Sequence, residues 1–213
     1  MITFTLTSCN RWNLLEKTLD SFLSLNTYPI KRYLLHEDSG NPEIVSKIKA
    51  KYPFIEVLES NRSGLLASVD KLYALVDTEY VLHNEDDWLF RGNPYFIQES
   101  LDILESRPDI HQVWIREEIP NSWLEEKTNA NYRMVKSCHY GDWTGFSFNP
   151  GLRRLSDYKL MFLEGYNSHN KHGMNSVLSE HDCNMVTIPY NYRAALLNNP
   201  SCVHIGDNQS TYK

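Results

Sequence analysis

Two hydrophobic periods alternate along the first half of the chain. Short runs rich in β-branched and aromatic residues predict strands at residues 2–8, 32–40, 54–60, 79–84 and 111–117. Between these runs, apolar residues recur at helical spacing, as Leu15, Leu19 and Phe22 do, and predict helices at residues 13–25, 42–52, 65–77 and 95–106. Strands that alternate with helices of this length predict an α/β fold with a mostly parallel central sheet flanked by helices.

Three of the predicted helices begin with local capping signals. Asn13 with Glu16 matches the capping-box pattern. Asn41 and Asn93 each stand directly before a proline, which places a capping amide ahead of a residue that favours the first helical turn. We therefore expect side-chain caps at these three asparagines.

From about residue 117 onward the periodicity weakens, and aromatic residues, Asn and His become frequent. This half is expected to add strands, a helix and long loops to the same sheet. A length of 213 residues suits one large domain with a sizeable core. We therefore expect a single domain over residues 1–213, with a regular half at 1–116 and a less regular half at 117–213.

The composition is ordinary for a soluble globular protein and narrows the classes of partner. Hydrophobic residues make up 41% and charged residues 23%, the formal net charge is −6, and no long block of Lys and Arg occurs. Because nucleic-acid binding rests on a basic patch, we expect no nucleic-acid partner. A phosphorylated small molecule stays compatible, since it needs only a few local cations or a metal.

Cysteine usage and hydropathy bear on the compartment. Cys9, Cys138, Cys183 and Cys202 lie far apart without a C-x-x-C pair, so we expect reduced thiols instead of disulfides or a zinc site. No run approaches the roughly 20 apolar residues of a membrane span, and a strand is predicted where a signal peptide would stand. A cytoplasmic location is expected, and the chain also suits one domain of a longer polypeptide.

Polar residues directly follow four of the predicted strands. If these strands are parallel, their carboxyl ends share one edge of the sheet, where ligands bind in open α/β folds. Loops are polar in any case, yet four such groups on one rim, two of them with adjacent acids, favour a binding site. The groups are Thr7 to Arg11, Glu37 to Ser39, Asn61 to Ser63, and the acidic triplet Glu85, Asp86 and Asp87.

The glycine-rich signatures of phosphate binding are missing. The chain has no G-x-G-x-x-G after its first strand and no G-x-x-x-x-G-K-[ST], and GFSFN at Gly145 lacks the second glycine of a nucleophile elbow. Carboxylates repel phosphate, but they reach it through a divalent cation that bridges protein and diphosphate oxygens. The acidic triplet therefore favours a metal-assisted site.

Three stretches follow one another in a family-like order. ITFTLTSCNRWNLLEKTLDSFL supplies a strand, an Asn-Arg turn and a helix; HEDSGN is an acidic turn; NRSGLLASVDKLYALVDTEYVLHNEDDW joins an N-x-x-G helix to a D-x-D-like strand end. In this order they resemble the family-2-type glycosyltransferases with the GT-A fold. The resemblance covers residues 2–90 closely and the remainder loosely. Within that family the chain is similar to N-terminal domains of large chlorovirus glycosyltransferases that modify the capsid protein.

The resemblance implies a nucleotide-sugar site in residues 1–116. Arg62 and Lys71 would lie near the base or the diphosphate, and Asp38 would hydrogen-bond the pyrimidine. The residues that would line the rest of the nucleotide pocket are Thr7, Ser8, Asn10 and Arg11.

The acidic triplet is the family's metal-binding position. Asp87 would bind Mn²⁺ or Mg²⁺, with Glu85 or Asp86 facing the ribose or the sugar. Glu85 stands where the family more often has Asp, and the longer side chain leaves its role open.

Residues 117–213 would then supply the acceptor side. VLSEHDCNMV resembles the family's acidic motif before a helix, in which a carboxylate acts as general base, and Glu180 and Asp182 are the candidates. Acids at a helix start are also favoured by the helix dipole alone. His204, in CVHIG, is a candidate second metal ligand or a structural histidine.

An aromatic stretch, CHYGDWTGFSFN at residues 138–149, suits an acceptor surface because sugars stack on aromatic faces, whereas Phe146 and Phe148 individually suit the core. Arg153 and Arg154 are expected to be solvated instead of approaching the diphosphate.

The activity implied is inverting, metal-dependent transfer of a sugar from a nucleotide-diphosphate sugar to a glycan or glycoprotein hydroxyl. UDP-hexose or UDP-deoxyhexose is the expected donor. Two other classes remain open: a nucleotidyltransferase or metal-dependent phosphohydrolase, and a non-catalytic module that binds sugar nucleotides or glycans.

Overall fold

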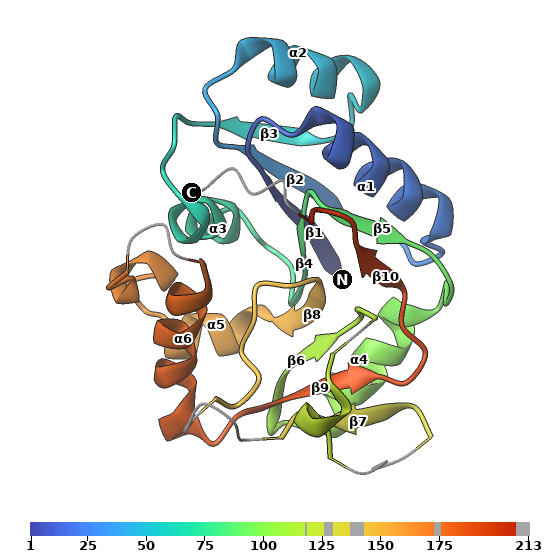
Figure 1. The fold of residues 1–213 in the computed structure, drawn as a ribbon, viewed down its shortest axis with the longest axis vertical. Helices are drawn as coiled ribbons and strands as arrows, with labels where there is room; N and C mark the ends of the chain where they lie inside the picture. The colour runs from blue at the N-terminus through green and yellow to red at the C-terminus, as the bar shows by residue number, and fades with distance from the viewer. Residues whose placement is uncertain (118, 126–129, 137–142, 173–175, 208–213) are drawn as a thin grey trace.

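The computed structural model describes residues 1–117, 119–125, 130–136, 143–172 and 176–207. Its main sheet has the strand order β3-β2-β1-β4-β8-β6-β9-β7 (Figure 1). Strands β3, β2, β1 and β4 are mutually parallel, β8 is antiparallel to both β4 and β6, β6 and β9 are parallel, and β7 is antiparallel to β9. The strands are β1 (Ile2–Ser8), β2 (Arg32–Glu37), β3 (Glu56–Glu59), β4 (Tyr80–Glu85), β6 (Ile110–Trp114), β7 (Tyr132–Met134), β8 (Gly151–Arg154) and β9 (Arg193–Leu197).

Helices cover both faces of this sheet. One apolar core joins the sheet to α1, α2 and α4, and a second joins it to α3, α5 and α6. Successive side chains of a strand point to opposite faces of the sheet, so Leu82 packs in the first core and Val81 in the second. The helices are α1 (Trp12–Leu25), α2 (Pro42–Lys51), α3 (Leu65–Ala74), α4 (Phe96–Ser106), α5 (Leu155–Met161) and α6 (Ser176–Thr187), with single turns η1 (Asn121–Trp123), η2 (Tyr166–His169) and η3 (Ile188–Tyr190).

The predicted α/β class with a mostly parallel sheet is confirmed, and each strand and helix expected in the first half is present. Two features were not expected. β8, from the second half, lies between β4 and β6, so the fourth and fifth predicted strands are not neighbours. A short strand β5 (Trp88–Phe90) directly follows the acidic triplet and pairs with β10 (Cys202–His204) in a separate two-stranded sheet.

Of the three expected caps, only Asn41 is confirmed: its side chain accepts a hydrogen bond from the Glu43 amide at 3.0 Å. The capping box at Asn13 is wrong, because α1 begins one residue earlier, at Trp12, after an N-cap residue that makes no side-chain cap bond. Asn93 accepts from the Tyr95 amide at 2.9 Å, which forms a turn ahead of α4 instead of capping it.

The expectation that Arg153 and Arg154 are solvated is also wrong. Arg153 is 4% exposed and faces the second core. Arg154 pairs with Asp157 and donates to the carbonyl oxygens of Leu104 and Arg107. Both lie opposite the amino-terminal part of β4, where Tyr80 and Val81 are their partners.

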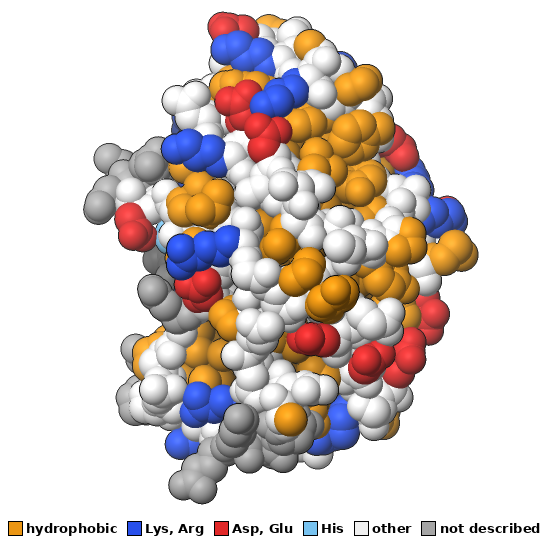
Figure 2. All heavy atoms as spheres, turned by 90° about the vertical axis from the view of Figure 1, so that its right-hand side faces the viewer, with side chains coloured by type: hydrophobic (Ala, Val, Ile, Leu, Met, Phe, Trp, Pro, Cys, Tyr) orange, Lys and Arg blue, Asp and Glu red, His pale blue; other side chains and the backbone are white. Residues whose placement is uncertain are grey.

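Charged side chains and three of the four cysteines can be placed in the described part of the chain. On the face shown in Figure 2, acidic and basic side chains are interspersed and do not gather into a basic patch. Cys9, Cys183 and Cys202 are buried and form no disulfide among the described residues, whereas Cys138 lies outside them. No helix in the described ranges is both long and apolar enough to cross a membrane.

Candidate active site

The four polar groups predicted to share a rim do so. In the parallel registers Glu37 pairs with Ser8 and with Glu59, and Glu85 pairs with Thr7, so the four strands end at one level. Thr7 and Ser8 are buried, at 7% and 5% exposure. The carboxyl edge of the parallel strands is therefore the candidate site.

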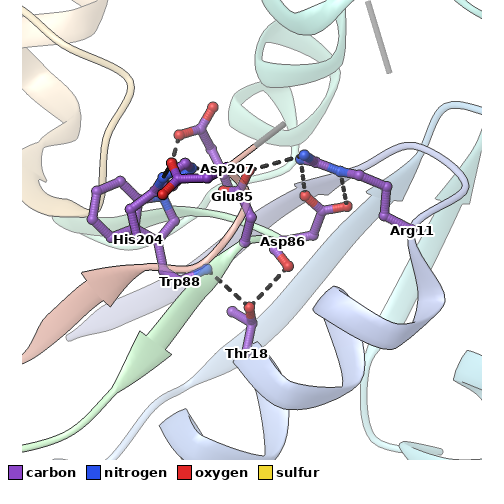
Figure 3. Close-up of polar contacts among 8 residues, drawn as sticks. Arg11, Thr18, Glu85, Asp86, Trp88, His204 and Asp207 are labelled. Atoms are coloured by element: carbon purple, nitrogen blue, oxygen red, sulfur yellow. Dashed lines mark hydrogen bonds and ion pairs between the residues drawn. The ribbon is translucent and has the colours of Figure 1, made fainter. Parts of the chain in front are cut away.

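Asp86 is the buried anchor of the acidic triplet (Figure 3). Its side chain is fully buried and forms a two-pronged ion pair with the Arg11 guanidinium, one bond being 3.2 Å long. Thr18 on α1 donates its hydroxyl to the Asp86 carbonyl at 2.9 Å and accepts from the Trp88 amide at 3.1 Å, which fixes the turn into β5. Burial raises the pKa of Asp86 to about 6, although Arg11 acts to lower it. Asp86 therefore has a structural role at this turn.

Asp87 lies between the Arg11 guanidinium and the His204 imidazole. Its Oδ2 atom is 2.9 Å from Nη1 of Arg11 and 3.4 Å from Nε2 of His204 on β10. Burial acts to raise the pKa of Asp87, but the hydrogen bond from His204 and the charge of Arg11 bring it below its usual value. His204 is in turn bound by Asp207, with Nδ1 and Oδ1 3.1 Å apart, which orients the ring (Figure 3). The pairing of β5 with β10 thus brings an imidazole to Asp87.

Glu85 faces the same space from the last position of β4. Its Oε2 accepts a weak bond from the Trp88 indole nitrogen at 3.4 Å. Burial, together with the negative charges of Asp87 and Glu180, raises the pKa of Glu85 well above its usual value. This effect places Glu180, from α6 in the second half, within electrostatic reach of the triplet.

Glu180 is held by the segment before β8. Its Oε1 atom accepts from the Phe148 amide at 2.7 Å and from the Ser147 hydroxyl at 3.1 Å. Burial raises the pKa of Glu180 and outweighs these bonds, which act to lower it. A half-buried, fixed carboxylate of raised basicity is what a general base requires.

Asp182 is held elsewhere. Its Oδ2 accepts from the Lys171 amide at 3.0 Å and lies 2.8 Å from Nδ1 of His172. Residues two apart on a helix point to different faces, so Glu180 and Asp182 do not converge. Of the two candidates, Glu180 is the one whose charge acts to raise the pKa of Glu85, whereas Asp182 binds residues 171 and 172.

Asp38 organises the loop between β3 and α3. Its Oδ1 accepts from the Ser63 amide and hydroxyl at 2.8 Å each, and its Oδ2 from the Gly64 amide at 2.8 Å. Gly64 has φ +91°, a conformation that glycine adopts without steric cost. Asp38 is 1% exposed, so holding this loop is the role that the contacts show, and base recognition stays a prediction.

The two predicted cations of this region are exposed on the same loop and helix. The Arg62 amide donates to the Asp38 carbonyl at 2.7 Å, and Lys71 Nζ lies 3.2 Å from the Ser63 hydroxyl.

Asn10, with φ +58°, donates its backbone amide to Glu37 Oε1 at 2.9 Å. A hollow of about 310 Å³ beside the start of α1 is lined by Asn10, Arg11, Trp12, Asn13, Leu14, Ile44 and Lys47.

A divalent cation is compatible with part of this donor set. Asp87 Oδ2 and His204 Nε2, 3.4 Å apart, are close enough to share one ion, and Mg²⁺ or Mn²⁺ often takes one or two protein ligands with the rest from substrate phosphate. Within the described ranges, no cluster of three or more His, Cys, Asp and Glu side chains forms a fuller metal site. Arg11 shares the same carboxylate, so the protein also brings its own cation there.

Sequence reasoning missed three residues that shape the site: Thr18, Ser147 and Gly206, the last of which lies directly against the Asp87 side chain. Thr18 had a detectable signal, since it is a polar residue on the buried face of α1. The other two gave none, because their contacts come from segments far away in the chain. The predicted aromatic surface is divided: residues 138–142 lie outside the described residues, and Phe146 and Phe148 belong to the core as expected.

The fold and the rim define an α/β protein of the GT-A glycosyltransferase architecture. Residues 3–182 match Glycosyl transferase family 2, and the chain belongs to this family. A comparison with curated proteins gave no match.

Solved structures agree with this fold at low sequence identity. TarS 1–349 of S. aureus superposes with a TM-score of 0.66 at 14% identity, over 96% of this chain and 60% of that one. The mannosyltransferase PcManGT of Pyrobaculum calidifontis, in complex with GDP-Man and Mn²⁺, gives 0.66 at 16% identity, over 99% and 58%. TarS 1–349 with UDP-GlcNAc gives 0.64 at 13%, over 98% and 61%. The chain thus spans about three fifths of these structures.

Proposed function

We propose that the chain is an inverting glycosyltransferase that moves a sugar from a nucleotide-diphosphate sugar to a hydroxyl of a glycan or glycoprotein. The observation that carries the proposal is one rim of a family-2 fold that holds both the contact between Asp87 and His204 and a half-buried carboxylate, Glu180, whose charge acts on Glu85. In this proposal residues 1–116 bind the donor and residues 117–213 bind the acceptor.

The donor is proposed to be a UDP-hexose or UDP-deoxyhexose. TarS has been solved with UDP and with UDP-GlcNAc, and PcManGT with GDP-Man, which supports a nucleotide-sugar donor of this general kind. Thr7, Ser8, Asn10 and Arg11 are proposed to line the nucleotide, and Asp38, Arg62 and Lys71 its base or diphosphate side. Glu85 or Asp86 is proposed to face the ribose or sugar; the burial of Asp86 favours Glu85.

Glu180 is proposed to take the proton from the acceptor hydroxyl. The acceptor oxygen forms a bond to the anomeric carbon from the side opposite the diphosphate, and the bond from that carbon to the diphosphate oxygen breaks, with its electron pair leaving on the diphosphate. Asp87 and His204 would hold Mn²⁺ or Mg²⁺, which when bound neutralises charge on the diphosphate. Arg11 adds a fixed positive charge beside the same carboxylates.

A panel of nucleotide sugars tests this proposal. UDP-glucose, UDP-galactose, UDP-GlcNAc and GDP-mannose are incubated with the protein, with and without Mn²⁺, and products are separated by chromatography, water serving as acceptor in the first round. Nucleoside diphosphate with free sugar supports transfer. Nucleoside monophosphate, pyrophosphate or orthophosphate supports the phosphohydrolase or nucleotidyltransferase alternative, and a thermal shift without any product supports a binding module.

The acceptor is tested separately once a donor is known. Chlorovirus capsid protein, from a strain lacking its glycan, is the first acceptor to try because of the resemblance noted in the sequence. Incorporation of labelled sugar into that protein supports it, and incorporation into free glycans alone contradicts it.

A further inference from the structure

Arg153 is a buried cation whose direct contacts described below are with neutral groups. It is 4% exposed, and its guanidinium carbon lies 5.6 Å from the ring centroids of both Phe146 and Phe148. Its Nη atoms donate to the Tyr73 hydroxyl at 3.3 Å and to the Ser147 carbonyl, and its Nε has no hydrogen-bond partner among the described residues. A buried charge of this kind is costly to the fold, so its presence calls for an offsetting role.

Ser147 is the residue on which Arg153 acts. Its carbonyl accepts from Arg153 and, at 2.8 Å, from Nε2 of Gln112, whose Oε1 accepts from the Ser147 amide at 3.3 Å. Gln112 and Arg153 are direct partners across β6 and β8. The backbone of Ser147 is thus clamped by two adjacent strand residues at 0% and 4% exposure.

The clamped segment leads directly to Glu180. The Ser147 hydroxyl and the next amide, that of Phe148, both donate to Glu180 Oε1, at 3.1 and 2.7 Å. Both bonds therefore fix the same oxygen of the Glu180 carboxylate. One helical turn later on α6, the Asn184 side chain accepts from the Thr144 amide at 2.8 Å and ties the same segment to the same helix.

We propose that Arg153 is a positioning residue for the transfer reaction, which from the core fixes Ser147 and, through it, the carboxylate of Glu180. This rests on the proposed function, in which Glu180 takes the proton. Arg153 does not touch the substrate in this arrangement. Its contribution is to hold the base in one orientation and to favour its charged form.

The charges that face Glu180 come from three other strands and their ends. Glu85, at the end of β4, disfavours the carboxylate by like-charge repulsion, whereas Arg153 on β8 and Arg116, just beyond β6, favour it. On α6 itself, Cys183 is a buried thiol whose pKa is raised by burial, so it stays neutral. Glu85 and burial both raise the pKa of Glu180, and Arg153 opposes them. Without Arg153 the pKa of Glu180 therefore rises, and the side chain keeps its proton to higher pH.

Substitutions separate this role from a merely structural one. Arg153→Met removes the charge and the bond to Ser147, Arg153→Lys retains the charge, and Ser147→Ala removes only the hydroxyl that reaches Glu180. Arg32→Met, at an ion pair with Glu56 near the opposite end of the sheet, and Ser106→Ala, at the end of α4, are the matched controls. Three quantities are measured for each variant. The first is the pH titration of the Glu180 carboxyl ¹³C signal, which is assigned by its absence in Glu180→Gln. The others are the pH dependence of hydrolysis of UDP-GlcNAc, or of the best donor found, and the affinity for UDP.

In Arg153→Met we expect the Glu180 midpoint to rise by about one unit, and kcat below that midpoint to fall about tenfold, with UDP affinity unchanged. Ser147→Ala shifts in the same direction by less, Arg153→Lys lies between wild type and Arg153→Met, and the controls match wild type. An unchanged midpoint in both Arg153→Met and Ser147→Ala overturns the proposal. If Arg153→Met does not fold, Arg153→Lys decides, since it keeps a core cation but loses the guanidinium that reaches the Ser147 carbonyl: a Glu180 midpoint equal to that of wild type then overturns the proposal.

Failure of the proposed function gives a different result. If the wild-type protein turns over no nucleotide sugar, the transferase proposal fails, while the ¹³C titration still reports whether Arg153 and Ser147 control the Glu180 carboxylate.

Discussion

Gly206 lies directly against Asp87. A Cβ added at position 206 would stand 2.4 Å from Oδ2 and 2.7 Å from Cβ of Asp87, closer than such atoms approach in proteins. The neighbouring Ile205 amide donates to the Asp87 carbonyl at 2.9 Å, which brings this segment across the acidic turn. The strand β10 therefore delivers to Asp87 both the imidazole of His204 and a backbone that leaves the carboxylate room.

Gly206→Ala is expected to displace the Asp87 carboxylate and to weaken Mn²⁺-dependent UDP binding about tenfold. The backbone of Gly206 is not in the left-handed region, so the added methyl acts through this contact and not through backbone strain. Calorimetric titration with UDP, with and without Mn²⁺, measures the effect. Metal-free UDP affinity is the internal control; an equal loss with and without Mn²⁺ would mean that the pocket, and not the metal side, was disturbed.

Asp86 and Asp87 are expected to differ sharply on replacement by alanine. Asp86→Ala removes the fully buried partner of Arg11 and should cost roughly 3 kcal/mol of unfolding free energy. Asp87→Ala leaves Arg11 paired with Asp86, should cost about 1 kcal/mol, and should abolish Mn²⁺-dependent UDP binding. Urea unfolding and UDP titration on both variants check this, and retained metal-dependent binding in Asp87→Ala would remove its role as ligand.

Glu180→Gln and Asp182→Asn are a matched pair on one helix. Each replaces a carboxylate by its amide, but only Glu180 acts on the charge of Glu85. We expect Glu180→Gln to lower kcat for the best donor by about 10²-fold or more, with little change in KM, and Asp182→Asn to stay within a few-fold of wild type. The reverse order of the two variants would assign the base to Asp182.

The regular half of the fold was predictable because its signals are local. Strands such as Ile2–Ser8 and helices such as Trp12–Leu25 can be recognised from the periodicity of their apolar residues. Parallel βαβ units then place the carboxyl ends of the strands at one edge of the sheet. The insertion of β8 between β4 and β6 was not predictable, since strand order depends on pairing between distant segments. Arg153 was misplaced for a related reason: a charged residue is normally exposed, and only the tertiary partners of β8 show that it is buried.

The candidate site likewise has a part that local signals predict and a part that depends on contacts between distant segments. The acidic triplet could be located because it ends a strong strand signal, but the choice between Glu180 and Asp182 required the face of α6 that meets residues 147–148. The Gly206 contact depends on the pairing of β5 with β10, two strands of three residues each that carry too short a pattern to read.

Asn41 and Asn13 test the difference between a formed cap and a mere cap pattern. Asn41 accepts a bond from the Glu43 amide, so Asn41→Ala should cost about 1 kcal/mol of unfolding free energy. Asn13 lies inside α1, so Asn13→Ala should change stability by no more than a few tenths of a kcal/mol. Urea denaturation of both variants compares them directly, and an equal loss in the two would contradict the assignment of the α1 start.

Asp38 should carry a pH-dependent part of the stability. Burial acts to raise its pKa, but the bonds from Ser60, Ser63 and Gly64 bring the pKa below the usual value of 3.8. A carboxyl with a lowered folded-state pKa contributes stability above its unfolded pKa, and this contribution is lost as pH falls through the folded pKa. Asp38→Asn, which accepts fewer bonds, should therefore cost about 1–2 kcal/mol at pH 7.

The gap between wild type and Asp38→Asn should stay constant from neutral pH down to about pH 5 and narrow below about pH 4, where the unfolded-state carboxyl takes up its proton while the folded carboxyl is still charged. Urea unfolding at a series of pH values measures it, with the exposed Asp102→Asn as control. A gap as wide at pH 3 as at pH 7 would show that the loop depends on the shape of the side chain and not on its charge. UDP affinity of the same variant then decides whether Asp38 also contacts the base. If Asp38 only holds the loop, Asp38→Asn should lose UDP binding only in proportion to the fraction of unfolded protein.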